Sequence, residues 1–169
     1  MADCIFGPPG REAKISLGGP ICVIGERINP TNRKALARDI AERSFKIVMK
    51  DAREQLAAGA HALDVNVSVP GTDEVASMRE AVRLIAGEFN VPLVIDTANP
   101  EALEAGIKAA GSKVLANSIN GETAKLNALL PVIKETGCAV VALCMDDRGI
   151  PVEAAERIAV AKKLLTRLD

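Results

Sequence analysis

The chain has 169 residues, of which 49% are hydrophobic, so it can form one domain with a core that needs no disulfides. Its 21 basic and 22 acidic side chains nearly cancel, and aromatic residues make up 2%, which argues against a nucleic-acid partner. The four cysteines form no CxxC pair, so neither a metal site nor a disulfide framework is predicted. No apolar run or signal peptide indicates a membrane, and we expect a soluble, cytoplasmic protein.

The N-terminal residues 1–20 contain the turn-forming sequences GPPG and LGGP. We predict an N-terminal extension here, with a small hairpin around residues 13–17, followed by one domain over residues 21–169. The first strand of that domain is expected at residues 21–24. Two helices follow it, at residues 34–41 and 45–58, with a break near Ser44.

The second expected strand, residues 61–67, contains polar residues inside an apolar run. Side chains alternate along a strand, so three apolar side chains share one face while Asp64 and Asn66 share the other. Helix capping cannot explain this pair, because both residues lie within the strand. The next helix is expected at residues 73–89, with Thr72 or Asp73 as its cap.

The third expected strand, residues 93–96, is an apolar run that ends abruptly at Asp96. Asn99 is a good N-cap and Pro100 suits a first helical position, so a helix is predicted to start at once and to continue to residue 110. The remaining expected elements are strand 113–116, helix 122–136, strand 139–143 and helix 152–168.

Strands and helices thus alternate about five times, and continuous apolar strands are typical of a parallel sheet covered by helices. The length suits a five-stranded doubly wound sheet of flavodoxin type. Polar residues after every strand instead favour a TIM-type (β/α)8 barrel, which gathers side chains from all its strand ends on one rim. We predict an α/β barrel of which this chain carries about the first five βα units. The polar groups are Glu26 and Asn29, Asp64 and Asn66, Asp96 and Asn99, Asn117 and Asn120, and Asp146.

Asp96 and Asn117 occupy equivalent strand ends, so a flat ligand could meet a carboxylate and an amide side by side. Such a pair suits a heterocycle edge that has N–H donors and ring acceptors. Asn99 and Asn120 are better explained as caps or turn residues, and His61 lacks a companion for metal binding.

Four motifs at successive strand ends resemble those of the pterin-binding methyltransferases: IGERINPT at residues 24–31, ALDVNV at 62–67, VIDTANPEALEAG at 94–106 and ANSING at 116–121. These are the methyltetrahydrofolate:corrinoid protein methyltransferases, related to the folate domain of cobalamin-dependent methionine synthase and to dihydropteroate synthase. The similarity extends from residue 21 to the C-terminus.

The resemblance implies a barrel that binds methyltetrahydrofolate in its mouth, releases tetrahydrofolate, and passes the N5-methyl group to the Co(I) of cobalamin on a separate corrinoid protein. N5 is a poor leaving group, so it must be hydrogen-bonded or protonated as the C–N bond breaks. The N5-contacting Asn and the second pterin carboxylate of the family lie on later strands, and no catalytic residue is assigned here. The candidate substrate-binding residues are Asp96, Asn117, Asp64, Asn66, Glu26, Asn29, Ser118 and Met145.

Two alternatives remain. One is a dihydropteroate synthase-like enzyme, although VSVPGTDE at residues 67–74 lacks the Arg-Pro-Gly element expected there. The other is a non-catalytic, flavodoxin-like binding module. If the barrel prediction is right, both edge strands are open, and we expect a longer native protein, a second chain, or a homodimer.

Overall fold

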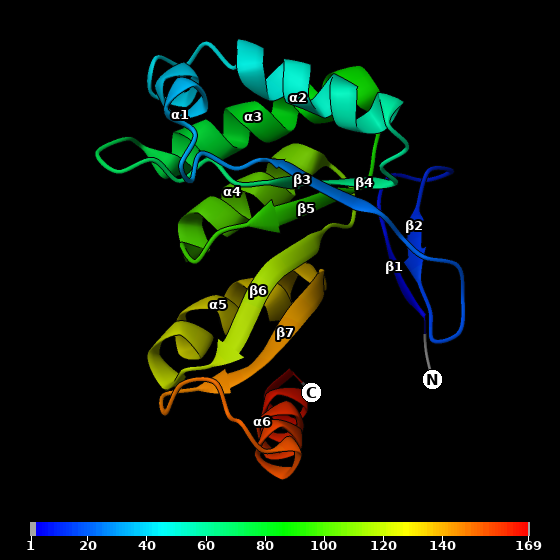
Figure 1. Ribbon diagram of the computed structural model, residues 1–169, viewed down its shortest axis with the longest axis vertical. Coiled ribbons are helices and arrows are strands. Elements are labelled where there is room, and N and C mark those ends of the chain that lie inside the picture. Colours follow the sequence, from blue (N-terminus) through cyan, green and yellow to red (C-terminus); the bar gives the residue numbers. More distant parts are fainter. Residues whose placement is uncertain (1–2, 169) are drawn as a thin grey trace.

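A computed structural model describes residues 3–168 of the chain (Figure 1). Its strands and helices are β1 (Cys4–Phe6), β2 (Ala13–Ile15), β3 (Ile24–Ile28), α1 (Lys34–Ala41), α2 (Lys46–Ala57), β4 (Ala62–Val65), α3 (Glu74–Phe89), β5 (Leu93–Asp96), α4 (Pro100–Ala110), β6 (Leu115–Gly121), α5 (Thr123–Thr136), β7 (Ala139–Asp146) and α6 (Ala154–Leu168).

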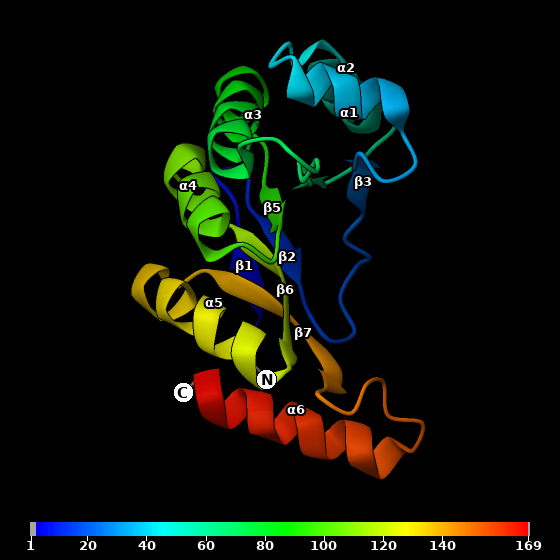
Figure 2. The same ribbon diagram turned by 90° about the vertical axis from the view of Figure 1, so that its left-hand side faces the viewer.

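Strands β3 to β7 form one parallel sheet in which every strand lies beside its neighbour in the chain. A flavodoxin-type sheet reverses direction at a switch point, so the order β3-β4-β5-β6-β7 excludes that alternative. Right-handed crossovers that advance in one direction leave all their helices on one face. Figure 2 shows α3, α4 and α5 stacked along one side of the strands, as in a (β/α)8 barrel. The predicted partial barrel is confirmed.

Alternate residues of each central strand belong to two different cores. Leu63, Val65 and Ile95 face the helices and join the larger core, in which Met78 of α3 and Leu103 of α4 are also buried. The other face of the sheet carries a smaller apolar layer, which is the inner face of the barrel segment. That inner layer consists of Ala62, Val94 and Leu115, together with Phe6 and Ala13.

The β1–β2 hairpin covers the inner face at the end where the strands begin (blue in Figure 1). Phe6 is 1% exposed, and the amide of Gly7 donates to the carbonyl of Lys113 over 2.7 Å, just before β6. A hairpin is present, but it spans residues 4–15, and only β2 falls within the predicted residues 13–17, so the predicted position is wrong. The division into an extension of residues 1–20 and a domain of residues 21–169 stays a prediction.

Most expected elements are present, with shifted ends at four strands. β4 covers Ala62–Val65 rather than residues 61–67, so Asn66 lies just after the strand and not within it as expected. β3 begins at Ile24 rather than at residue 21, and β6 and β7 continue to Gly121 and Asp146. The sequence pattern missed these extensions because they contain polar residues, which an edge strand or a strand end can expose to solvent. Within residues 3–168, no helix combines the length and the apolar character needed to cross a membrane.

Candidate functional site

Four polar side chains meet on the inner face, linked in pairs across the strands. The Asn117 amide on β6 donates to the Asp64 carboxylate on β4 over 2.9 Å. The amide of Asn66, just after β4, donates to the carboxylate of Asp96 at the end of β5, also over 2.9 Å. The structure thus brings together the two carboxylates and two amides that the sequence singled out.

Strand register explains why these four residues converge. Asp64, Asp96 and Asn117 each lie two positions after a member of the inner apolar layer, and side chains two apart share a face. Asp96 is paired directly with Asn117 in the parallel ladder. Asp96 and Asn117 therefore lie directly above Val94 and Leu115, toward the ends of the strands, while Asp64 is paired with Val94 one level below.

The carboxyl group of Asp64 is buried and incompletely hydrogen-bonded. Its side chain is 3% exposed, and among the described residues its Oδ1 atom has no hydrogen-bond partner. Burial raises the pKa of Asp64 to about 7; the Asn117 hydrogen bond opposes this shift, and the charges of Asp96 and Glu26 add to it. A donor N–H brought to Oδ1 by a ligand would satisfy this atom and favour the ionised form.

The pKa of Asp96 is also raised. Burial raises its pKa, the hydrogen bond from Asn66 opposes the shift, and the negative charges of Glu26 and Glu74 reinforce it. Two neighbouring acids with raised pKa values are typical of a binding or catalytic site.

A small pocket of about 160 Å³ adjoins these residues on the side of α5. Ser118, one of the predicted site residues, lies in its wall, and its role in binding stays a prediction. The lining is Asp96, Thr97, Ala98, Asn117, Ser118, Asn120, Lys125 and Leu129.

The other candidates lie outside the hydrogen-bonded network. Glu26 is exposed on β3 and reaches the site only through its charge. The side-chain Oδ1 of Asn29 accepts from the backbone amide of Thr31 over 3.0 Å, which is a local turn contact. Met145 is half-buried on β7. Asn99, as expected, caps α4 by accepting from Glu101.

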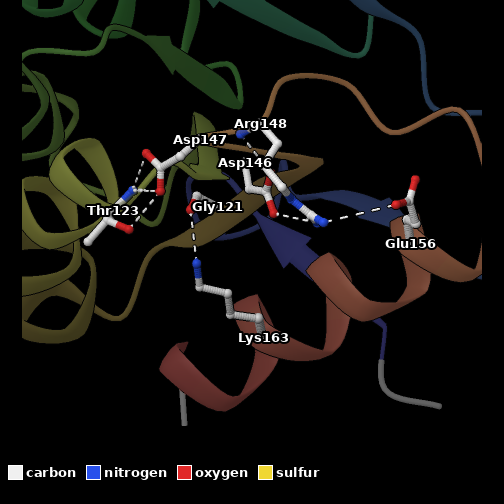
Figure 3. Close-up of polar contacts among 7 residues, drawn as sticks. All are labelled: Gly121, Thr123, Asp146, Asp147, Arg148, Glu156 and Lys163. Carbon is white, nitrogen blue, oxygen red and sulfur yellow. Dashed lines mark hydrogen bonds and ion pairs between the residues drawn. The ribbon is translucent and has the colours of Figure 1, made fainter.

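The end of β7 is fixed by ion pairs and hydrogen bonds of its own (Figure 3). Arg148 lies 3.0 Å from Asp146 and 4.0 Å from Glu156 of α6, and the hydrogen bonds from Arg148 lower the pKa of Asp146. The Thr123 hydroxyl donates to Asp147 over 2.8 Å, tying the loop to the start of α5. Asp146 follows the strand-end pattern, but Arg148 donates to both of its carboxylate oxygens, whereas Oδ1 of Asp64 has no partner among the described residues.

Sequence reasoning overlooked one buried residue beside the site. Thr97 follows Asp96 and is 6% exposed, and its hydroxyl donates to Glu74 of α3 over 2.5 Å. A threonine directly after a strand-end carboxylate was the available signal. Within residues 3–168, no group of three His, Cys, Asp or Glu side chains is placed to hold a metal ion.

A family model described as pterin binding enzyme matches residues 25–166. The chain belongs to this family. The pterin-binding assignment agrees with the fold and with an inner face that bears polar groups at the strand ends.

Two curated relatives of this pterin-binding chain are methionine synthases. That of Mycobacterium tuberculosis (strain ATCC 25618 / H37Rv) is 29% identical over 150 residues, covering 86% of this chain and 13% of the relative. That of Mycobacterium leprae (strain TN) is 27% identical over 150 residues, covering 86% and 12%. The chain therefore spans about an eighth of the length of these relatives.

Among solved structures, the chain is similar to dihydropteroate synthase from Burkholderia cenocepacia. The sequence identity is 26% and the TM-score is 0.46, over 76% of this chain and 40% of that chain.

Proposed function

We propose that the chain binds methyltetrahydrofolate and that its N5-methyl group is passed to the Co(I) centre of a corrinoid on a separate protein. The observation that carries this proposal is the cluster of Asp64, Asn66, Asp96 and Asn117, in which the buried Asp64 Oδ1 has no hydrogen-bond partner among the described residues. The names of the curated relatives, both methionine synthases, support methyl transfer as the reaction class.

The cluster has the donors and acceptors that a pterin ring requires. A reduced pterin edge presents N–H donors beside a carbonyl and ring-nitrogen acceptors. Ionised Asp64 and Asp96 accept from N–H groups, while the amides of Asn66 and Asn117 both donate and accept. The two carboxylate–amide hydrogen bonds of the free chain hold these groups in place before the ligand arrives.

The chain's residues bind and orient the ring, and the corrinoid supplies a nucleophilic metal that takes the methyl group. When the N5–methyl bond breaks, its electron pair stays on N5, which must then gain a hydrogen bond or a proton. A ring fixed by its polar edge keeps N5 and its methyl group oriented toward the partner. These 169 residues contain no Asp-x-His-x-x-Gly cobalamin motif, so the proposal places the corrinoid outside them.

Calorimetric titration with methyltetrahydrofolate tests the binding step. We expect Asp96→Ala to weaken binding by ~1.5 to 3 kcal/mol, the value of a hydrogen bond to a charged group. Glu101→Gln is the matched control, because it removes one carboxylate from an exposed position on α4 and should leave the affinity unchanged. An unchanged affinity in Asp96→Ala would remove Asp96 from the site, and no binding by the parent chain would refute the proposal.

A further inference from the structure

Thr97 links the end of β5 to three other parts of the molecule. Its amide donates to the carbonyl of Asn117 on β6 over 3.1 Å, and its hydroxyl donates to Glu74 on α3 over 2.5 Å. The same hydroxyl accepts from the amide of Asn99, the N-cap of α4, over 3.0 Å. One buried residue, through its backbone amide and its hydroxyl, therefore connects two strands and two helices beside Asp96.

Helix capping does not explain why Glu74 is there. The N-cap of α3 is Asp73, whose carboxylate already accepts from the amide of Ala76 over 2.9 Å. Glu74, in the first turn, is half-buried and directs its carboxylate to the loop after β5 instead. Its contact with Thr97 joins residues 23 positions apart.

We infer that Thr97 and Glu74 form a positioning pair that holds Asp96 and Asn117 side by side for the ligand. This inference rests on the proposed pterin site and adds two residues that act on it without being among its four polar groups. The Thr97 amide fixes the β6 backbone at Asn117, while its hydroxyl, held by Glu74, fixes the backbone one residue after Asp96.

Loss of the contact between Thr97 and Glu74 is expected to lower the affinity for the ligand. A ligand held by several hydrogen bonds loses affinity when one partner moves by about 1 Å, because the remaining bonds cannot all be made. Without the Thr97 hydroxyl, the Asn99 amide and the Glu74 carboxylate lose a partner in a half-buried place. The strand end that carries Asp96 would then be free to shift.

Glu74 also acts on Asp96 through its charge. Burial is the largest cause of the raised pKa of Asp96, and Glu74 contributes with Glu26 of β3. The other titratable groups near Asp96 are Asp64 of β4, which interacts with it through charge, and Lys125 of α5, which lines the same pocket. Glu74→Gln keeps an oxygen that can accept from Thr97 while it removes the charge.

The first test measures methyltetrahydrofolate affinity by calorimetry in three variants of the 169-residue chain. We expect Thr97→Val to bind about 10-fold or more weakly, and Thr97→Ser, which keeps the hydroxyl, to stay within about threefold of the parent. The control Thr136→Val removes a hydroxyl that bonds to Val132 within α5 and should change nothing. Parent-like affinity in Thr97→Val, or an equal loss in Thr97→Ser, would overturn the positioning role.

The second test needs no ligand, so it separates this inference from the proposed function. The carboxyl ¹³C resonance of Asp96 is titrated by NMR in the free parent chain, in Glu74→Gln, and in the control Glu88→Gln, whose carboxylate pairs with Arg53. We expect a lower pKa for Asp96 in Glu74→Gln and the parent value in the control. If Asp96 has the same pKa in Glu74→Gln as in the parent chain, Glu74 does not influence the site and the inference is refuted. If the parent binds no folate, the proposed function fails while this titration still decides the coupling.

Discussion

Asp64 shows how one buried carboxylate can lower stability while it leaves an acceptor for the proposed ligand. Its carboxyl group lies on a strand that is buried on both faces, with one amide donor and the neighbouring negative charges of Asp96 and Glu26. An ionised carboxylate in such a place is poorly solvated. The free protein therefore holds a group that a suitable N–H donor would stabilise.

The raised pKa of Asp64 predicts the pH dependence of stability. Because the pKa is about 7 in the folded chain and ordinarily 3.8, the folded state binds the proton more tightly, and stability falls as the pH rises from near 4 to about 7. Asp64→Asn should raise the free energy of unfolding by ~1 to 3 kcal/mol at about pH 8, where the parent carboxylate is charged. At about pH 4 the variant should show no such gain.

Urea denaturation of both proteins at the two pH values measures this difference. Glu101→Gln, an exposed substitution of the same type, should show no comparable pH-dependent gain. A variant that is less stable than the parent at the higher pH would mean that the carboxylate of Asp64 is well compensated in the folded chain.

At the scale of elements, the start of α2 depends on a side chain from α1. Phe45, which precedes α2, has a φ of 52° and offers no side-chain cap. Asp39 of α1, 6% exposed, accepts instead from the amides of Lys46 and Ile47 over 3.1 and 2.9 Å, and from the Ser44 hydroxyl over 2.7 Å. One buried carboxylate thus joins two helices and fixes their turn.

We predict that Asp39→Ala costs ~3 kcal/mol of unfolding free energy, because it leaves several part-buried donors without an acceptor. The ordinary N-cap variant Asp73→Ala should cost about 1 kcal/mol. Denaturation of the two variants side by side gives the comparison. Equal losses would show that water replaces Asp39 at the start of α2.

At the scale of the whole molecule, both outer strands of the sheet have an unpaired edge. Among the described residues, β3 and β7 each pair on one side only, and apolar side chains lie exposed near both. Val23, before β3, is 47% exposed, and Leu143 of β7 is 42% exposed. Unpaired edges beside exposed apolar residues favour association with another chain.

We therefore predict that the 169-residue chain associates in solution, and we expect a homodimer. Sedimentation equilibrium gives its mass, and Leu143→Lys should shift the population toward the monomer by placing a charge at the β7 edge. Glu12→Lys, on the exposed hairpin, controls for the added positive charge. A stable monomer at all concentrations would contradict association through these edges.

The proposed acceptor gives another prediction at this scale. Methyltetrahydrofolate mixed with the chain and free reduced cobalamin should show slow transfer at best, because the corrinoid is expected on a separate protein. Absorbance of the cobalamin follows the reaction, and a reaction without the chain is the control. Tight co-purification of a corrinoid with this chain alone would contradict a separate acceptor protein.

Local patterns determined most of what the sequence could predict. The cap at Asn99 followed by Pro100 located α4, and the alternation that separates Asp64 from its apolar neighbours placed it on the inner face. These features depend on residues one to four positions apart, whose geometry is fixed by the backbone of a single helix or strand. Polar residues at every strand end also favoured a barrel over a flavodoxin-type sheet, as the strand order confirmed.

Only the tertiary structure decided which of those polar residues remain available to a ligand. Asp146 has the same strand-end position as Asp96, but Arg148 occupies its carboxylate. The contacts of Thr97 with Glu74, and of Asn117 with Asp64, join residues 23 and 53 positions apart. Such contacts depend on how whole elements pack and on the register between strands, and spacing along the sequence does not encode either one directly.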